Sequence, residues 1–301
     1  MSQPRLRQQL SAPGLLKTVR QSFAAIADPG QGRSEISLTD ALMSGLAVFG
    51  LKYPSLLQFD EGRNEAIIRA NLKTLYGVER APCDTQLRTR LDPVAPDELC
   101  APFRAVHRDL QRQNALARYR YLDGHLLLSV DGTGQFMSSR IGCPDCCVKE
   151  ASGGEYYYHQ LLGAVLVHPE LRTVLPLAPE AITRQDGASK NDCERNAAKR
   201  LLERIRHQHP QLKFIVVEDA LAANGPHLEL LGALGLRDII GVKEGDHEAL
   251  FEGVQERLRA GLCEELEYTD PKGVLHGFRF ANDLALNKSH PHVRVNFLEG
   301  V

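Results

Sequence analysis

Two aspartates stand at the ends of short apolar runs that are typical of buried strands. Asp131 follows the run 125–130, and Asp219 ends the run that begins at residue 214. If these strands are neighbours and parallel, both carboxylates project from the same edge of one sheet. Carboxylates brought that close raise each other's pKa, so the arrangement is stable chiefly with a divalent cation between them. Such a pair can hold two metal ions about 4 Å apart and stabilise the attacking and leaving oxygens of a phosphodiester. We therefore predict Asp131 and Asp219 as metal ligands and catalytic residues.

Each aspartate also has a simpler interpretation. Asp131 begins the segment Asp-Gly-Thr-Gly, and Asp-Gly after a strand is a frequent hairpin turn. Asp219 follows a buried strand, and its simpler interpretation is that it is a helix N-cap without a catalytic role. The pair, on matching strands of one sheet, is more specific than either residue alone.

A cluster of cysteines gives a second chemical signal. Cys143, Cys146 and Cys147 have the C-x-x-C spacing of half a zinc site, and His159, His168 and Cys193 are the residues that could complete it. The alternative is a set of free thiols in a loop. Seven cysteines are an odd number in a chain that begins without an export signal, so we do not expect a disulfide framework.

The elements that must position these residues change in character near residue 120. Up to there the apolar residues recur at helical spacing, and one helix is expected over 97–119. Beyond it the pattern predicts three strands, then a helix over 191–207, a strand, a helix, a strand and a further helix, followed by β-structure. Three leading strands suggest an antiparallel meander, and the later βαβ units suggest parallel additions. This is the element order of a ribonuclease H-like mixed sheet in an α/β protein.

The charge is divided along the chain. The net charge is −2, but residues 1–120 carry 17 Lys and Arg against 12 Asp and Glu, whereas residues 121–301 carry 19 against 26. The first part is therefore suited to a DNA partner. Its arginines could form a phosphate-facing surface or a solvated helix face: Arg88, Arg90, Arg104, Arg108, Arg112, Arg118 and Arg120.

Several protein classes are disfavoured. No apolar run approaches the ~18 residues of a membrane helix and no signal peptide is apparent, so we expect a cytoplasmic protein without a membrane partner. The motifs of phosphate-cradling loops and of serine hydrolases are also missing from the sequence. An unrelated α/β enzyme would require a closed pocket at the carboxyl ends of the strands.

Several longer stretches together resemble insertion-sequence transposases of the DDE type. They span nearly the whole chain: 38–49, 52–60, 84–92, 131–134, 143–147, 157–164, 185–196 and 216–219. The resemblance implies a helical DNA-binding region, here 1–120, and a ribonuclease H-like catalytic domain, here 121–301, that uses three acids and Mg²⁺ or Mn²⁺. Asp131 and Asp219 match the first two acids.

The third acid of such families is a Glu on a helix that often follows a β-rich insertion. Here the sequence ends inside what resembles the start of that insertion, so we expect a catalytic domain that is incomplete at its C-terminus. Glu248 and Glu252, on the helix after the strand 239–242, are the rivals for the missing role, although they could equally be solvated carboxylates.

The function expected is that of a bacterial insertion-sequence transposase, which cuts DNA at transposon ends and transfers the strand to a target, with this chain catalytically incomplete. The alternative is a DNA-binding or inhibitory partner of full-length transposase, without catalysis. The protein partners expected are a second copy of this chain, in a homodimer, or full-length transposase. A remnant without a role is a further alternative.

Overall fold

The computed structural model describes residues 8–30, 35–151, 153–183 and 193–300. The chain divides into two compact units, Met1–Arg118 with Pro176–Ala178, and Tyr119–Leu175 with Pro179–Val301. No helix among the described residues is long and apolar enough to cross a membrane.

The first unit is helical. Its helices are α2 (Ala12–Phe23), α3 (Leu38–Gly50), α4 (Leu56–Gly62), α5 (Ala66–Tyr76), α6 (Asp84–Leu91), the short 3₁₀ helix η1 (Pro96–Cys100) and α7 (Ala101–Arg112). Serine side chains cap α2, α3 and α4 by accepting a backbone N–H of the first turn. A core around Met43, Phe59 and Leu87 joins α2, α3, α4, α5 and α6.

The single helix expected over 97–119 is wrong. It is divided into η1, α7 and a second 3₁₀ helix, η2 (Ala115–Tyr119). Asn114 lies in the left-handed region with φ of 54°, and Asn tolerates this conformation better than most residues. The chain therefore leaves α7 directly after Arg112.

The second unit contains a mixed seven-stranded sheet. Its strands are β1 (Leu126–Ser138), β2 (Cys147–Ala151), β3 (Gly154–His168), β4 (Leu171–Pro176), β5 (Glu180–Ile182), β6 (Phe214–Glu218) and β7 (Arg237–Ile240). The central order is β2-β3-β1-β6-β7, and β4 and β5 also pair with β3. β3 is antiparallel to β1, whereas β1, β6 and β7 are mutually parallel along this path. The prediction that the strands leading to Asp131 and Asp219 are parallel neighbours is confirmed.

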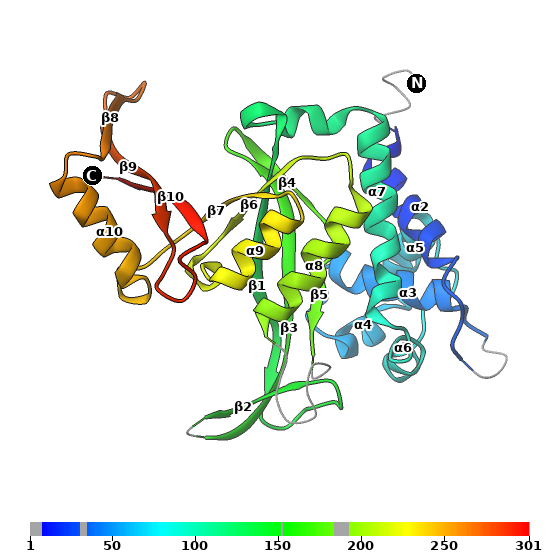
Figure 1. Cartoon of the computed structure of the whole chain (residues 1–301). Coiled ribbons are helices and arrows are strands. Elements are labelled where there is room, and N and C mark those ends of the chain that lie inside the picture. Colours follow the sequence, from blue (N-terminus) through cyan, green and yellow to red (C-terminus); the bar gives the residue numbers. More distant parts are fainter. Residues whose placement is uncertain (1–7, 31–34, 152, 184–192, 301) are drawn as a thin grey trace. The chain divides into compact units, whose positions relative to one another are not determined.

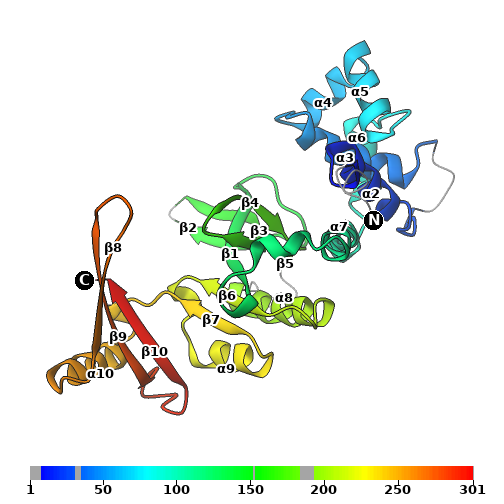
Figure 2. The ribbon, with the colours of Figure 1, turned by 90° about the horizontal axis from the view of Figure 1, so that it is seen from above.

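Two helices pack beside each other in this unit, α8 (Glu194–Gln208) and α9 (Gly225–Ala233). Figures 1 and 2 show both on one face of the sheet. The inward face of α8 consists of small and branched apolar residues, Ala197, Ala198, Leu201, Leu202 and Ile205. Burial of this face, rather than helix propensity, fixes α8 against β3 and β5.

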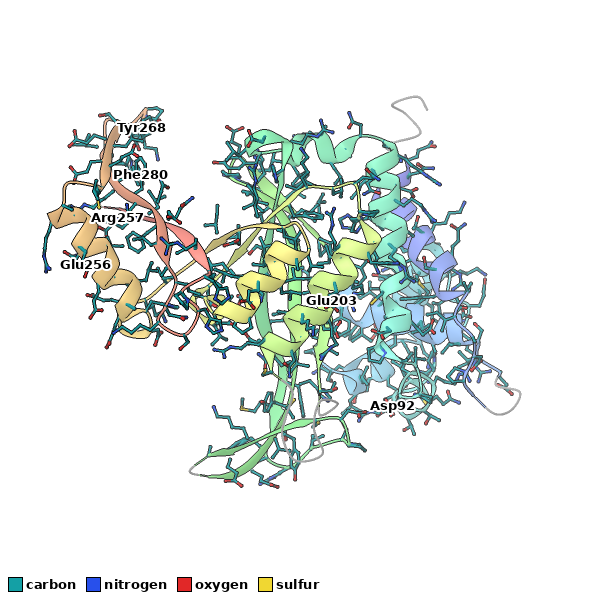
Figure 3. All side chains as sticks on the ribbon, viewed as in Figure 1. Asp92, Glu203, Glu256, Arg257, Tyr268 and Phe280 are labelled. Carbon is teal, nitrogen blue, oxygen red and sulfur yellow. The ribbon has the colours of Figure 1, made fainter. Side chains whose placement is uncertain are left out.

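The last part of the chain builds a separate three-stranded antiparallel sheet. Its strands are β8 (Glu264–Thr269), β9 (Leu275–Ala285) and β10 (Arg294–Gly300), and the helix α10 (Glu248–Arg259) precedes them. A small core that includes Leu250, Val254 and Phe297 holds α10 against β9. In Figure 3, Glu256 and Arg257 mark α10, while Tyr268 and Phe280 mark the strands. The β-structure predicted after residue 264 is present.

Candidate functional site

Asp131 and Asp219 lie at one edge of the mixed sheet. Ser129 of β1 is in register with Val217 of β6, so each aspartate comes two residues beyond a paired position of parallel strands. Both side chains are exposed, and both residues line one shallow hollow. Parallel pairing therefore brings the two predicted acids to a common site.

The hairpin-turn interpretation of Asp131 is wrong. β1 does not turn at Asp-Gly-Thr-Gly but continues to Ser138, and Asp131 pairs with Gly163 of β3. β6 ends at Glu218, and β1 extends past it along β3. Asp131 thus lies where β1 loses its parallel neighbour but keeps its antiparallel one.

Asp219 does act as an N-cap, as its simpler interpretation predicted. Its Oδ1 accepts the backbone N–H of Leu221 at 2.9 Å, at the start of the 3₁₀ helix η5 (Ala220–Ala222). The cap fixes the carboxylate and uses one of its two oxygens. The other oxygen makes no hydrogen bond to a described residue and is available to a ligand.

A third carboxylate, which the sequence did not reveal, belongs to the same hollow. Glu194 is the first residue of α8, and it is half-buried. Its Oε1 accepts a hydrogen bond from Gln160 Nε2 of β3. A Cβ added to Gly132 would lie 2.2 Å from the same oxygen, so glycine is required beside Asp131 for Glu194 to occupy this position.

The pKa of Glu194 is affected by both aspartates. The pKa of Glu194 is raised, first by burial and then by the negative charge of Asp131, with a smaller contribution from Asp219. The hydrogen bond from Gln160 opposes this rise. A first-turn acid is ordinarily favoured by the helix dipole, so burial and like charge outweigh that effect here.

The backbone around the acids is held by a half-buried ion-pair cluster and by a buried contact between a glutamate and a histidine. Glu180 of β5 accepts from Arg200 at 2.7 Å and from Arg204 at 2.5 Å, which anchors α8 to the sheet edge. Glu218, directly before Asp219, contacts Nε2 of His227 on α9 at 2.6 Å, and both side chains are only 6% exposed. α8 and α9 are therefore fixed where they flank the hollow.

The chemistry of the hollow favours a hard cation rather than a small organic ligand. Carboxylate oxygens are the ligands that Mg²⁺ and Mn²⁺ prefer. The volume of the hollow is about 30 Å³, whereas pockets for organic ligands enclose roughly 300–1,000 Å³. Among the described residues, one group of possible metal ligands has all its ligand atoms within 4.8 Å of one another, and it is made of cysteines and a histidine. The carboxylate oxygens of the three acids are therefore farther apart than this.

The rival acids do not belong to this hollow. Glu248 and Glu252 lie on α10, which packs on β9, and Glu252 Oε2 is 3.9 Å from Lys288 Nζ. Neither residue lines the hollow that Asp131 and Asp219 share. Their proposed role as the third acid has no support in the contacts described.

Part of the cysteine cluster comes together. Cys143, Cys146 and His159 place their ligand atoms within 4.8 Å of one another. Cys147 does not join them, and its inclusion was wrong: it begins β2, and its buried Sγ contacts the carbonyl of Ile182 at 3.5 Å. The sulfur of Cys147 is therefore engaged outside the group of Cys143, Cys146 and His159. Cys193 and His168 are also not in this group.

The predicted basic surface is present in part. Three exposed arginines are spaced four residues apart on α7: Arg104, Arg108 and Arg112. They make no ion pair with any described residue. We call them the α7 arginine row. Arg90 differs, since it is only 12% exposed and pairs with Asp28. Beside the acids, Arg195 is exposed and lines the hollow.

Comparison with known proteins gives little further information. No protein-family model matches the chain, and no curated protein matches it. One solved structure, piggyBac transposase in a synaptic complex with hairpin DNA, aligns over 98% of this chain and 59% of that chain, with 12% identity and a TM-score of 0.32. The chain thus spans less than two thirds of the length of that transposase.

Proposed function

We propose that this chain is a DDE-type transposase polypeptide of a bacterial insertion sequence, which acts on DNA phosphodiesters at transposon ends. The observation that carries the proposal is the convergence of Asp131, Asp219 and Glu194 at the carboxyl edge of two parallel strands. On this proposal residues 121–301 form a ribonuclease H-like catalytic domain, and the helical residues 1–120 bind DNA.

The three acids would hold Mg²⁺ or Mn²⁺. When bound, such a cation activates water and stabilises charge on the attacking and leaving oxygens. Asp131 and Asp219 present their carboxylates from fixed backbone positions, and Gln160 orients Glu194 between β3 and α8. Arg195, at the rim of the hollow, supplies a positive charge for the DNA backbone.

The reaction would proceed in two displacements. A water oxygen bonds to the phosphorus at the transposon end, the P–O3′ bond breaks, and the leaving oxygen takes a proton as a free 3′ hydroxyl. That hydroxyl then attacks a target phosphodiester and displaces the target's own 3′ oxygen. Glu194 is our proposal for the third carboxylate, so the chain itself would contain all three acids.

The first test is cation binding. Mn²⁺ is titrated into the full chain and followed by isothermal titration calorimetry, with Asp131→Asn, Asp219→Asn and Glu194→Gln as variants. We expect each variant to weaken binding at least tenfold. Glu203→Gln is the matched control, because Glu203 is an exposed acid of the same helix, α8 (Figure 3), and does not line the hollow. Equal binding by all variants would refute the assignment of the site.

The second test is DNA cleavage. The substrate is a supercoiled plasmid that carries the DNA flanking this coding sequence on both sides, and the products are nicked circles and labelled 3′ ends. Nicking that requires Mg²⁺ or Mn²⁺ and is abolished by Asp131→Asn would support an active nuclease. Salt-sensitive binding without nicking, retained by the Asp131→Asn and Asp219→Asn double variant, would instead identify a DNA-binding partner of full-length transposase. If the chain shows no DNA binding and no nicking, the proposal is refuted.

A further inference from the structure

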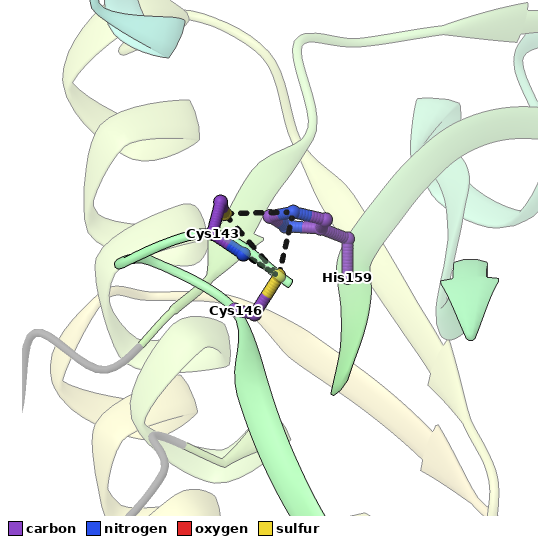
Figure 4. Close-up of side chains that lie close together, drawn as sticks. All are labelled: Cys143, Cys146 and His159. Atoms are coloured by element: carbon purple, nitrogen blue, oxygen red, sulfur yellow. Dashed lines mark hydrogen bonds between the residues drawn. The ribbon is translucent and has the colours of Figure 1, made fainter. Parts of the chain in front are cut away.

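The loop before β2 folds back onto β3 and brings two thiols to one imidazole. Cys143 Sγ and Cys146 Sγ are 3.2 Å apart, and each is 3.3 Å from Nε2 of His159. Figure 4 shows the three side chains converging, with the cysteines on the loop and His159 on the strand. The cluster is not used by the acidic site.

The spacings fit a tetrahedral metal. With Zn–S bonds of ~2.3 Å and Zn–N bonds of ~2.0–2.1 Å, tetrahedral ligand atoms lie about 3.6–3.8 Å apart. The two sulfur–nitrogen separations are therefore short by about 0.3 Å, and the sulfur–sulfur separation is short by about 0.6 Å. An outward movement of that size creates the position for the ion without a change of backbone path.

The backbone of the loop is also arranged as in a metal-binding turn. The N–H of Cys143 donates to Cys146 Sγ at 3.1 Å, and the N–H of Cys146 donates to the carbonyl of Cys143 at 3.2 Å. A donor aimed at sulfur favours the thiolate, which is the form that binds metal. Cys146 is 1% exposed and Cys143 is exposed, so the site has one closed and one open side.

A glycine holds the loop against the strand. A Cβ on Gly142 would lie 2.7 Å from the ring of Tyr157, so only glycine allows the chain to pass this close immediately before Cys143. Tyr157 stands two residues before His159 on β3. The approach of the cysteines to His159 is thus determined by packing and does not depend on the thiols alone.

We propose that Cys143, Cys146 and His159 bind Zn²⁺, with a water or another small ligand in the fourth position. Two sulfurs and one imidazole nitrogen form a donor set that selects zinc over Mg²⁺ or Ca²⁺. Within the described residues no other His, Cys, Asp or Glu joins the group. The ion would fasten the connection between β1 and β2 to β3 beside Gln160, the residue that holds Glu194.

The test is zinc binding by the reduced full chain, and it does not depend on any activity toward DNA. After reduction and dialysis against Zn²⁺, we expect one equivalent of zinc per chain. Replacement by Co²⁺ should give the absorption bands of thiolate-bound tetrahedral cobalt. Cys143→Ser should weaken zinc binding at least tenfold, and because Cys143 is exposed this change leaves the packing intact. His159→Gln should do the same.

Cys263→Ser is the matched control, since Cys263 lies in another part of the chain with its Sγ 3.8 Å from the carbonyl of Val254. A second measurement uses trypsin, because Arg140 is exposed in the loop that the metal would tether. Zinc should slow cleavage after Arg140 in the wild-type chain and leave it unchanged in Cys143→Ser. The proposal is overturned if the reduced chain takes up no stoichiometric zinc, if Cys143→Ser binds as tightly as wild type, or if the thiols are found only as a Cys143–Cys146 disulfide that, once reduced, takes up no zinc.

Discussion

Neutralising Glu194 should stabilise the protein when no divalent cation is present. In Glu194→Gln the side chain keeps an oxygen that can accept from Gln160, and it loses the charge that Asp131 and Asp219 repel. Most substitutions of a half-buried, hydrogen-bonded residue destabilise a protein. A gain in stability would therefore show that the buried negative charge, opposed by the two aspartates, costs more than its hydrogen bond contributes.

The size of the gain follows from the exposure of the partners. Asp131 and Asp219 are both exposed, so water and salt screen each repulsion to about 0.2–1 kcal/mol, the range of a surface charge pair. Two such interactions give about 1 kcal/mol, which raises the melting temperature of a unit of this size by about 2–4 °C. Added Mg²⁺ or Mn²⁺ should narrow or reverse the difference, because a bound cation stabilises only the charged site.

The pH dependence has a definite sign. A carboxyl whose pKa is raised by folding is destabilising only in its ionised form, so the wild-type chain loses stability as pH rises through the folded pKa of Glu194. The advantage of Glu194→Gln should be present at pH 8 and vanish near pH 4, where the wild-type side chain is protonated. Calorimetric melting of the full chain in EDTA, at matched pH, measures this. Glu203→Gln should show no gain, and a Glu194→Gln variant less stable than wild type at pH 8 would refute the reasoning.

Three further outcomes are expected. Replacing the whole α7 arginine row by glutamine should weaken DNA binding uniformly across sequences and reduce the slope of log K against log salt by about 2–3, measured by fluorescence anisotropy; an unchanged slope would exclude phosphate contacts there. Burial lowers the pKa of His107, and its Nε2–H donates to the carbonyl of Pro176 at 3.0 Å. Because protonation of this side chain favours the unfolded state, the helical unit should lose stability as pH falls below about 6.5. His107→Gln should remove that loss in thermal melts. His227→Leu should cost about 3 kcal/mol of unfolding free energy by leaving the buried Glu218 unpaired, and adding Glu218→Leu should recover part of it in a denaturant titration.

The sequence predicted the arrangement of the acidic edge where its pattern was local. Short apolar runs ending in Asp131 and Asp219 were sufficient to predict two strands, and the order of three leading strands followed by βαβ units indicated that they pair in parallel. Both features depend on chain periodicity and on the handedness of crossovers, which neighbouring residues determine. The helix α8 was expected for the same reason, from apolar residues that recur at 3.6-residue spacing.

Glu194 could not be chosen in the same way, although one signal was present. It is an acid in the first turn of a helix that leads into β6, and that position alone is equally typical of a dipole-stabilising residue. Its role depends on the side chain lying over Gly132 and against Gln160, residues far from it in the sequence. Glu248 and Glu252 had a comparable sequence context, and packing of α10 on β9 places them elsewhere.

The sequence by itself determined the element types, the two aspartates at strand ends and the Cys-x-x-Cys spacing, because each is a property of a short segment. The tertiary structure decided that β1 continues past Asp131, that Cys147 contacts Ile182 and not the group of Cys143 and Cys146, and that Glu194 joins the acids. These outcomes depend on strand register and on which helix face is buried. Both are settled by the free energy of packing distant segments together, which no local pattern contains.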